Sequence, residues 1–191
     1  VFGFIFTFFS SFGQSFFLGL FSISIRDTLS ISHGQFGTIY ASATLCSSIL
    51  FIWLGKKIDD VNVFKFSLFV IPLLAFSCFF FSKIFSVVFL FAAVFLMRFS
   101  GQGMMSHTAS TTISRYFTKS RGKALSASWF GLSFGEFLLP VLIVYLLTLY
   151  TWQNIWLTIS LVVIIFLPIA SYLLIKNLNL DSRETDSDQN N

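Results

Sequence analysis

Two charged side chains lie deep inside long apolar stretches of this 191-residue sequence. Arg98 follows Ser86 by twelve residues, and Glu136 follows Ala124 by twelve residues. At about 1.5 Å per residue, a helix places each charge roughly 18 Å from the end of its stretch. The apolar core of a bilayer is about 30 Å thick, so both charges are expected near its midplane. Because a charge at that depth costs about 2.5–3.5 kcal/mol or more, we expect neither side chain to face lipid.

The two side chains suggest complementary chemistry. The guanidinium of Arg98 offers a planar fork of donors that suits a carboxylate. The carboxyl group of Glu136 can take up and release a proton, so the pair could couple proton movement to the movement of an organic anion through a central cavity. The alternative is a permanent Arg98–Glu136 ion pair that only fixes the packing of two helices.

The stretch that contains Arg98 carries further polar residues. Gln102 follows Arg98 by about one helical turn and shares its face, so we expect it to bind substrate. His107 lies nearer the far end of the stretch. It is a candidate proton relay, and a hydrogen-bonded packing histidine is the alternative.

The first apolar stretch has a polar stripe at helical spacing. We expect the stripe to face protein or a wet cavity, because lipid offers polar groups no partner. Lining of the cavity and contact with substrate is one interpretation, and hydrogen bonding between helices is the other. The stripe consists of Ser11, Gln14, Ser15, Leu18 and Ser22, and its substrate-binding candidates are Ser11, Gln14 and Ser15.

The composition requires a membrane around these residues. Hydrophobic residues make up 55% of the chain and charged residues only 10%, whereas soluble domains carry about 25% charged residues. Cys46 and Cys78 lie in apolar stretches and are interpreted as small core residues. The sequence shows no basic stripe for nucleic acid, no metal-ligand cluster and no phosphate-binding loop, so we expect neither a nucleic-acid partner nor a cofactor.

Six stretches are long and apolar enough to cross a bilayer as helices, which predicts an all-α membrane protein. Pro residues lie inside three of them. The tail that follows, residues 176–191, is rich in Asp, Ser and Asn, which is typical of disorder or the start of a linker. The six-helix domain covers residues 1–175, with spans at about 1–25, 35–54, 63–82, 86–110, 124–148 and 152–175.

The loops differ in charge. Seven basic residues follow the second and fourth spans, whereas only Arg26 and Lys83 lie in the loops on the other side. By the positive-inside rule, the second and fourth loops are cytoplasmic, and so are both ends of the chain. A plasma membrane or a bacterial inner membrane fits this topology.

The two basic loops resemble those of the major facilitator superfamily. Gly55 and Asp59 match the G-x-x-x-D-R-x-G loop between helices two and three, although Asp60 stands where Arg is usual and Asn62 where Gly is usual. Between helices four and five, Arg115-Tyr116-Phe117 and Arg121-Gly122-Lys123-Ala124-Leu125 resemble the aromatic-Phe and R-G-x-A-L signature of the same superfamily.

Two of the spans add to the resemblance. Arg98 with Gly101-Gln102-Gly103 is similar to helix four of the superfamily. Gly131, Gly135 and Pro140 resemble the G-x-x-x-G…P pattern of its helix five. Together these residues look most like the monocarboxylate-porter-like branch.

The resemblance carries expectations about architecture and mechanism. It implies that the chain is the first six-helix half of a twelve-helix transporter, built from two inverted three-helix repeats. The partners implied are a C-terminal six-helix half, a small organic anion such as a monocarboxylate, a proton and the lipid bilayer. The implied mechanism is secondary active transport by alternating access around a midplane site, in symport with the proton.

Other functions were weighed against this one. Gly131-Leu132-Ser133-Phe134-Gly135 spells the G-x-S-x-G motif of serine hydrolases, but no strand precedes it, and Ala127, Gly131 and Gly135 suit a helix-packing seam. We therefore expect no enzyme. An exporter of another small molecule, or a non-transporting scaffold or channel subunit, remains the alternative, although no ring of charges typical of a channel is present.

Overall fold

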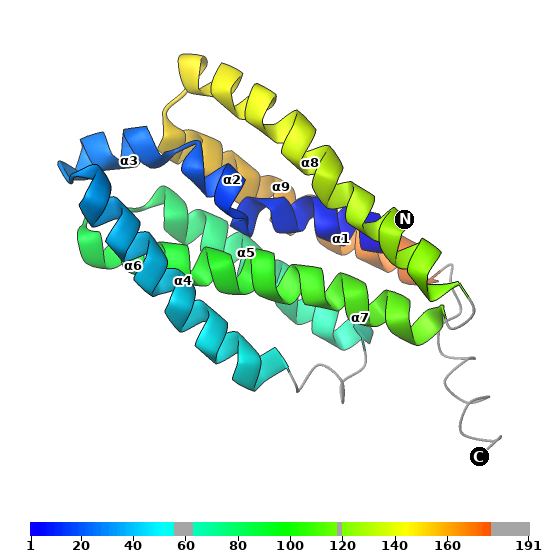
Figure 1. Ribbon diagram of the computed structural model, residues 1–191. Coiled ribbons are helices and arrows are strands. Elements are labelled where there is room, and N and C mark those ends of the chain that lie inside the picture. The colour runs from blue at the N-terminus through cyan, green and yellow to red at the C-terminus, as the bar shows by residue number, and fades with distance from the viewer. Residues whose placement is uncertain (56–62, 118–119, 177–191) are drawn as a thin grey trace.

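The computed structural model describes residues 1–55, 63–117 and 120–176, and helices account for nearly all of them (Figure 1). These ranges contain no strand, so the predicted all-α fold class is confirmed. The predicted tail lies almost wholly outside the described residues. In chain order the elements are α1 (Phe2–Ser10), η1 (Ser11–Gly13), α2 (Ser15–Gly19), α3 (Ser22–Leu29), α4 (His33–Gly55), α5 (Val63–Ser82), α6 (Val87–Met97), η3 (Arg98–Met105), α7 (Ser106–Tyr116), α8 (Arg121–Leu149) and α9 (Trp152–Lys176).

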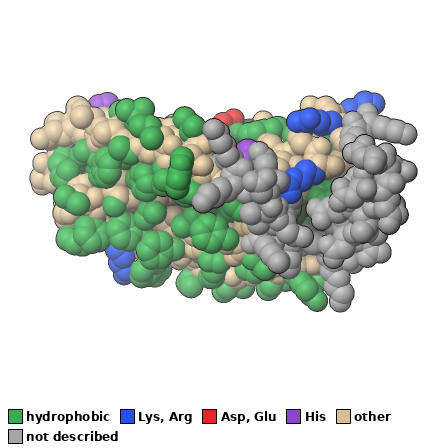
Figure 2. Space-filling view, turned by 90° about the horizontal axis from the view of Figure 1, so that it is seen from below, with side chains coloured by type: hydrophobic (Ala, Val, Ile, Leu, Met, Phe, Trp, Pro, Cys, Tyr) green, Lys and Arg blue, Asp and Glu red, His purple; other side chains and the backbone are tan. Residues whose placement is uncertain are grey.

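The outer surface of the bundle is apolar. Among the described residues, five helical segments are long and apolar enough to cross a membrane, and Phe66–Ser82 is a shorter apolar helix. Large hydrophobic side chains are exposed along α4, α5, α8 and α9, and hydrophobic side chains occupy a large part of the described surface in Figure 2. Water would disfavour so large an apolar surface, whereas lipid suits it. The chain is therefore an integral, multi-pass membrane protein.

The first span is not the single helix that its polar stripe predicts. The structure divides it into α1, the 3-10 turn η1, α2 and α3. At Gln14 the backbone is extended, with φ −81° and ψ 155°, so the regular α-helical spacing is lost between Ser11 and Ser15. A glycine, Gly13, precedes the break and allows close contact with the fourth span at that point.

The fourth span runs without interruption through α6, η3 and α7, and it continues to Tyr116, beyond the predicted end near Ser110. Its middle part, η3, is a π-helix of eight residues that begins at Arg98. π-Helical segments inside α-helices are rare and often occur at functional sites. Ser86 caps the start of the span, since its Oγ accepts a hydrogen bond from the Phe89 N–H at 3.4 Å.

The connection between α3 and α4 contains a reciprocal pair of hydrogen bonds between Ser32 and Gln35. The Ser32 N–H donates to Gln35 Oε1 at 2.8 Å, and the Gln35 N–H donates to Ser32 Oγ at 3.2 Å. This reciprocal pair is a capping box, and it satisfies donors that the helix would otherwise leave unpaired. The preceding Ser30 adopts the left-handed conformation that ends α3.

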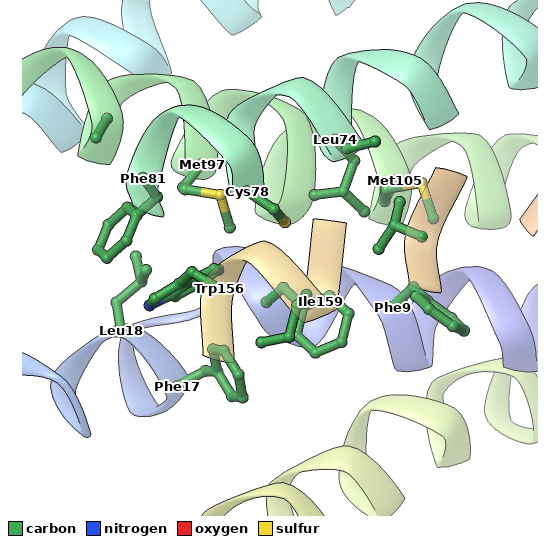
Figure 3. Packing of buried hydrophobic residues seen from close by; sticks show 14 of the residues in the cluster. Phe9, Phe17, Leu18, Leu74, Cys78, Phe81, Met97, Met105, Trp156 and Ile159 are labelled. Carbon is green, nitrogen blue, oxygen red and sulfur yellow. The ribbon is translucent and has the colours of Figure 1, made fainter. Parts of the chain in front are cut away.

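The core is centred on an aromatic cluster that joins the first, third and sixth spans (Figure 3). The Trp156 ring of α9 lies 5.4 Å from that of Phe17, 5.1 Å from that of Phe21 and 4.4 Å from that of Phe81. A buried serine adds a polar link, because Ser160 Oγ donates to the Ala75 carbonyl of α5 at 2.7 Å. A second space lies outside this core, and residues of α4, η3 and α8 surround it.

Candidate functional site

A cavity of about 370 Å³, lined by polar and apolar residues, opens beside the fourth span. Volumes of this size are typical of small-molecule sites. Among the described side chains that line the cavity, Arg98 alone carries a permanent charge. His107 is the other ionisable side chain of the lining. The lining residues are Ser47, Ser48, Phe51 and Ile52 of α4, Arg98, Gln102 and Gly103 of η3, Ser106, His107 and Ser110 of α7, and Trp129 of α8.

Arg98 is half-buried and is held from the side of the first span. Its Nη1 donates to the Gly13 carbonyl at 3.1 Å and to Ser15 Oγ at 3.2 Å. Tyr40 of α4 completes the arrangement, since its hydroxyl bonds Ser15 Oγ at 3.0 Å and its ring centroid lies 5.7 Å from the guanidinium carbon. Both hydrogen bonds use Nη1, and Nε has no partner among the described residues. The described residues that bind the guanidinium carry no negative charge, so an anion in the cavity could pair with it.

The position of Arg98 depends on a close crossing of two spans. A Cβ added to Gly101 of η3 would lie 2.7 Å from both Cα and N of Gly13. Only glycine at both positions lets the backbones approach this closely. The crossing brings the Gly13 carbonyl within reach of the Arg98 guanidinium, so the break in the first span supplies an acceptor that a regular helix would have used internally.

Three more polar atoms on the cavity have no hydrogen-bond partner among the described residues. They are Gln102 Oε1, Ser106 Oγ and His107 Nε2, and all three are buried. The His107 ring packs edge-on against Phe51, with the centroids 5.5 Å apart. Buried polar groups usually have partners, and these three are exceptions within the described part of the chain. The structure thus places Arg98, Gln102 and His107 on one cavity.

The candidates from the first span separate. Ser15 binds Arg98 as described, and Gln14 lies at the break, half-buried. Ser11 is buried against Gly135 of α8, and its Oγ has no partner among the described residues. The division follows from the break, because a stripe defined by α-helical spacing cannot stay on one face across an extended residue.

Glu136 does not meet Arg98. It lies exposed on α8, and within the described residues the two side chains make no ion pair. The neighbouring glycines face the first span instead: a Cβ on Gly131 would meet the Phe4 carbonyl of α1, and one on Gly135 would meet Ser11 Oγ of η1. Pro140 lies inside the same helix, nearer its end.

The residues of the two loop motifs lie at the ends of helices. Gly55 is the last residue of α4, and Asp59 lies outside the described residues. Arg115 is in the last turn of α7, half-buried, and Arg121 with Gly122 begins α8.

The hydrolase alternative finds no support in the geometry. Ser133 lies in the middle of the continuous helix α8, and it is exposed. The sharp strand-to-helix turn that a nucleophile elbow requires does not occur there.

Sequence reasoning missed several cavity residues. Ser106 and Ser110 continue the spacing of four that begins with Arg98 and Gln102, so the pattern that identified Gln102 could have identified them too. Ser47, Ser48 and Phe51 give no comparable signal, because α4 has polar residues on several faces and its rotation cannot be read from the sequence.

The family comparison agrees with the helical architecture. The model of the family described as Major Facilitator Superfamily matches residues 3–190 of the chain. No curated protein and no solved structure matches the sequence.

Proposed function

We propose that this chain, which belongs to the major facilitator superfamily, forms the N-terminal half of a proton-coupled transporter for small organic anions of the monocarboxylate class. Membership of the family means transport of a small solute across a membrane. The substrate class, the proton and the C-terminal half that would close the cavity belong to the proposal. So does secondary active transport by alternating access around a midplane site.

The observation that carries the proposal is the arrangement of Arg98. A half-buried guanidinium is held at Nη1 by Gly13 and Ser15, and its Nε faces no partner among the described residues. A carboxylate that reached the guanidinium from the cavity would gain charge-assisted hydrogen bonds. No carboxylate of the described cavity lining competes for the guanidinium.

Proton coupling is assigned to His107 and Glu136. His107 lies on the cavity and can take up a proton at its unpartnered Nε2. Glu136, on α8, is exposed within this chain, where the second half would approach it. A proton taken up by either group would compensate the charge of a co-transported anion.

Transport by the full-length protein in proteoliposomes tests the substrate class. Uptake of labelled lactate or pyruvate under an inward proton gradient should fall about 30-fold or more in Arg98→Ala, since loss of a buried, hydrogen-bonded charge pair costs about 2–5 kcal/mol. Lys83→Gln is the control, because Lys83 is exposed and does not line the cavity. If the wild type takes up no monocarboxylate, the substrate class and the role of Arg98 are wrong, and the family membership stands.

The same assay separates the two proton groups. Uptake by Glu136→Gln and by His107→Gln is measured with and without the proton gradient. The variant that lacks the coupling group should lose its response to the gradient. Unchanged responses in both variants would exclude coupling through these residues.

A further inference from the structure

We propose that Tyr40 is a positioning residue for substrate binding, which holds the Arg98 guanidinium in place both through Ser15 and through its own ring. The inference rests on the proposed function, because it assigns a role to a residue that supports the anion-binding side chain. Of the three residues, Arg98 lines the cavity, whereas Ser15 and Tyr40 do not. Tyr40 therefore acts on the substrate through Arg98.

The first step is the need of an arginine for support. Its long side chain has many rotamers, and a ligand that binds a disordered guanidinium must supply the free energy that orders it. In the described chain, Arg98 Nη1 donates to the Gly13 carbonyl and to Ser15 Oγ. The close crossing with Gly101 fixes the backbone of Gly13. The Ser15 hydroxyl, in contrast, is on a side chain that can rotate.

The second step is the hydrogen bond that fixes Ser15. Its side chain is exposed and directly follows the extended residue Gln14, so packing alone does not select one of its staggered rotamers. The Tyr40 hydroxyl donates to Ser15 Oγ at 3.0 Å, and Arg98 Nη1 donates to the same atom at 3.2 Å. A hydroxyl oxygen accepts two hydrogen bonds, so the bond from Tyr40 holds Oγ where Arg98 needs it.

The third step is the contact between the Tyr40 ring and the cation. The ring centroid lies 5.7 Å from the guanidinium carbon of Arg98, within the range of about 6 Å for cation–π attraction. Phe36, one turn earlier on α4, stacks on the same ring with the centroids 6.3 Å apart. Because the ring attracts the guanidinium without a carboxylate, the guanidinium can still pair with an anion.

The kinetics of uptake by the full-length protein in proteoliposomes test the inference. The concentration dependence of labelled lactate or pyruvate uptake is measured for the wild type, Tyr40→Phe and Tyr40→Leu. Tyr40→Phe keeps the ring and removes the hydroxyl, so KM should rise about threefold to tenfold. Tyr40→Leu removes both contacts and should raise KM about tenfold to a hundredfold. The maximal rate should change little, because orientation of the guanidinium acts on binding.

A second substitution identifies the route from Tyr40 to Arg98. In a Ser15→Ala background, Tyr40→Phe should raise KM no further, because the acceptor of the hydroxyl has already been removed. Tyr40→Leu should still raise KM there, since the ring contacts Arg98 directly. A role of Tyr40 in helix packing alone would give the same effects with and without Ser15 Oγ.

Tyr145→Phe and Tyr145→Leu are the matched controls and should leave KM unchanged. Tyr145 is exposed on α8 and does not line the cavity. Each variant must elute as a single species before reconstitution. If Tyr40→Leu does not fold, Tyr40→Phe with and without Ser15→Ala decides the result.

The outcomes separate the inference from the proposed function. Loss of uptake in Arg98→Ala with an unchanged KM in the Tyr40 variants overturns the positioning role and leaves the anion site in place. An equal rise of KM on Tyr40→Phe with and without Ser15→Ala also overturns it. If the wild type takes up no monocarboxylate, the proposed substrate class and the role of Tyr40 are both wrong.

Discussion

Replacing Gly101 with alanine should weaken the contact that positions Arg98. The added Cβ would lie 2.7 Å from Cα and N of Gly13, whereas ordinary contact begins at 3.4 Å. The two spans must therefore separate locally by roughly 0.7 Å. A shift of that size along the Arg98 Nη1–Gly13 hydrogen bond, which is 3.1 Å long, would break it.

The expected magnitude follows from the nature of the clash. Backbone atoms cannot turn aside as a flexible side chain can, so we expect the usual cost of overpacking, about 1–3 kcal/mol. For a domain of this size, that cost corresponds to a decrease of about 2–12 °C in melting temperature. Uptake of the transported acid should fall as well, because the guanidinium loses a bond that orients it.

Glycine 37 provides the matched control. It also lies inside a helix, α4, and an added Cβ there would meet no atom within 4 Å. Gly37→Ala should be neutral or slightly stabilising, since alanine is favoured over glycine in helices by about 0.5–1 kcal/mol. The two full-length variants are compared by thermal unfolding in detergent and by uptake in proteoliposomes. If Gly101→Ala is as stable and as active as Gly37→Ala, the close crossing of the first and fourth spans is refuted.

Two further predictions concern the core. Trp156→Ala should destabilise the protein by about 3–5 kcal/mol, because it removes a fully buried ring at the centre of the aromatic cluster. The control Phe137→Ala removes an exposed ring and should change the melting temperature in detergent only a little. Equal effects of the two substitutions on the melting temperature would contradict the assigned core. Ser160→Ala removes the buried hydrogen bond from α9 to α5 and should lower the free energy of unfolding by about 1 kcal/mol. Ser42→Ala, at an exposed position, should change it hardly at all. Thermal unfolding of the two variants measures the difference.

The sequence was a good guide to the class of fold and a poorer guide to its irregularities. Apolar runs separated by short charged loops are sufficient to predict an all-α membrane protein, because lipid leaves few other ways to satisfy a backbone. The break at Gln14 could not be predicted in the same way. A single preceding glycine is tolerated in many helices, and the glycine that Gly13 packs against, Gly101, is distant in sequence.

The site was predictable where its residues share one helix. Arg98 and Gln102 were found from charge, depth and spacing within a single span, and the structure places both on the cavity with His107. The relations between spans were not predictable, because they depend on how each helix is rotated about its axis. Ser15 therefore bonds Arg98 while Ser11 faces α8, although the two residues share one predicted stripe.

The electrostatics of Arg98 connect these observations to function. Placing a guanidinium in the apolar region costs about 2.5–3.5 kcal/mol or more, and hydrogen bonds to Gly13 and Ser15 offset only part of that cost, since neither acceptor carries a charge. An ion pair with Glu136 would have neutralised the guanidinium permanently, but it is absent from the described residues. The cavity thus keeps an uncompensated positive charge whose Nε has no partner there. An anion in the cavity would supply the missing charge, whereas a fixed internal pair would have left the cavity with no preference for an anion.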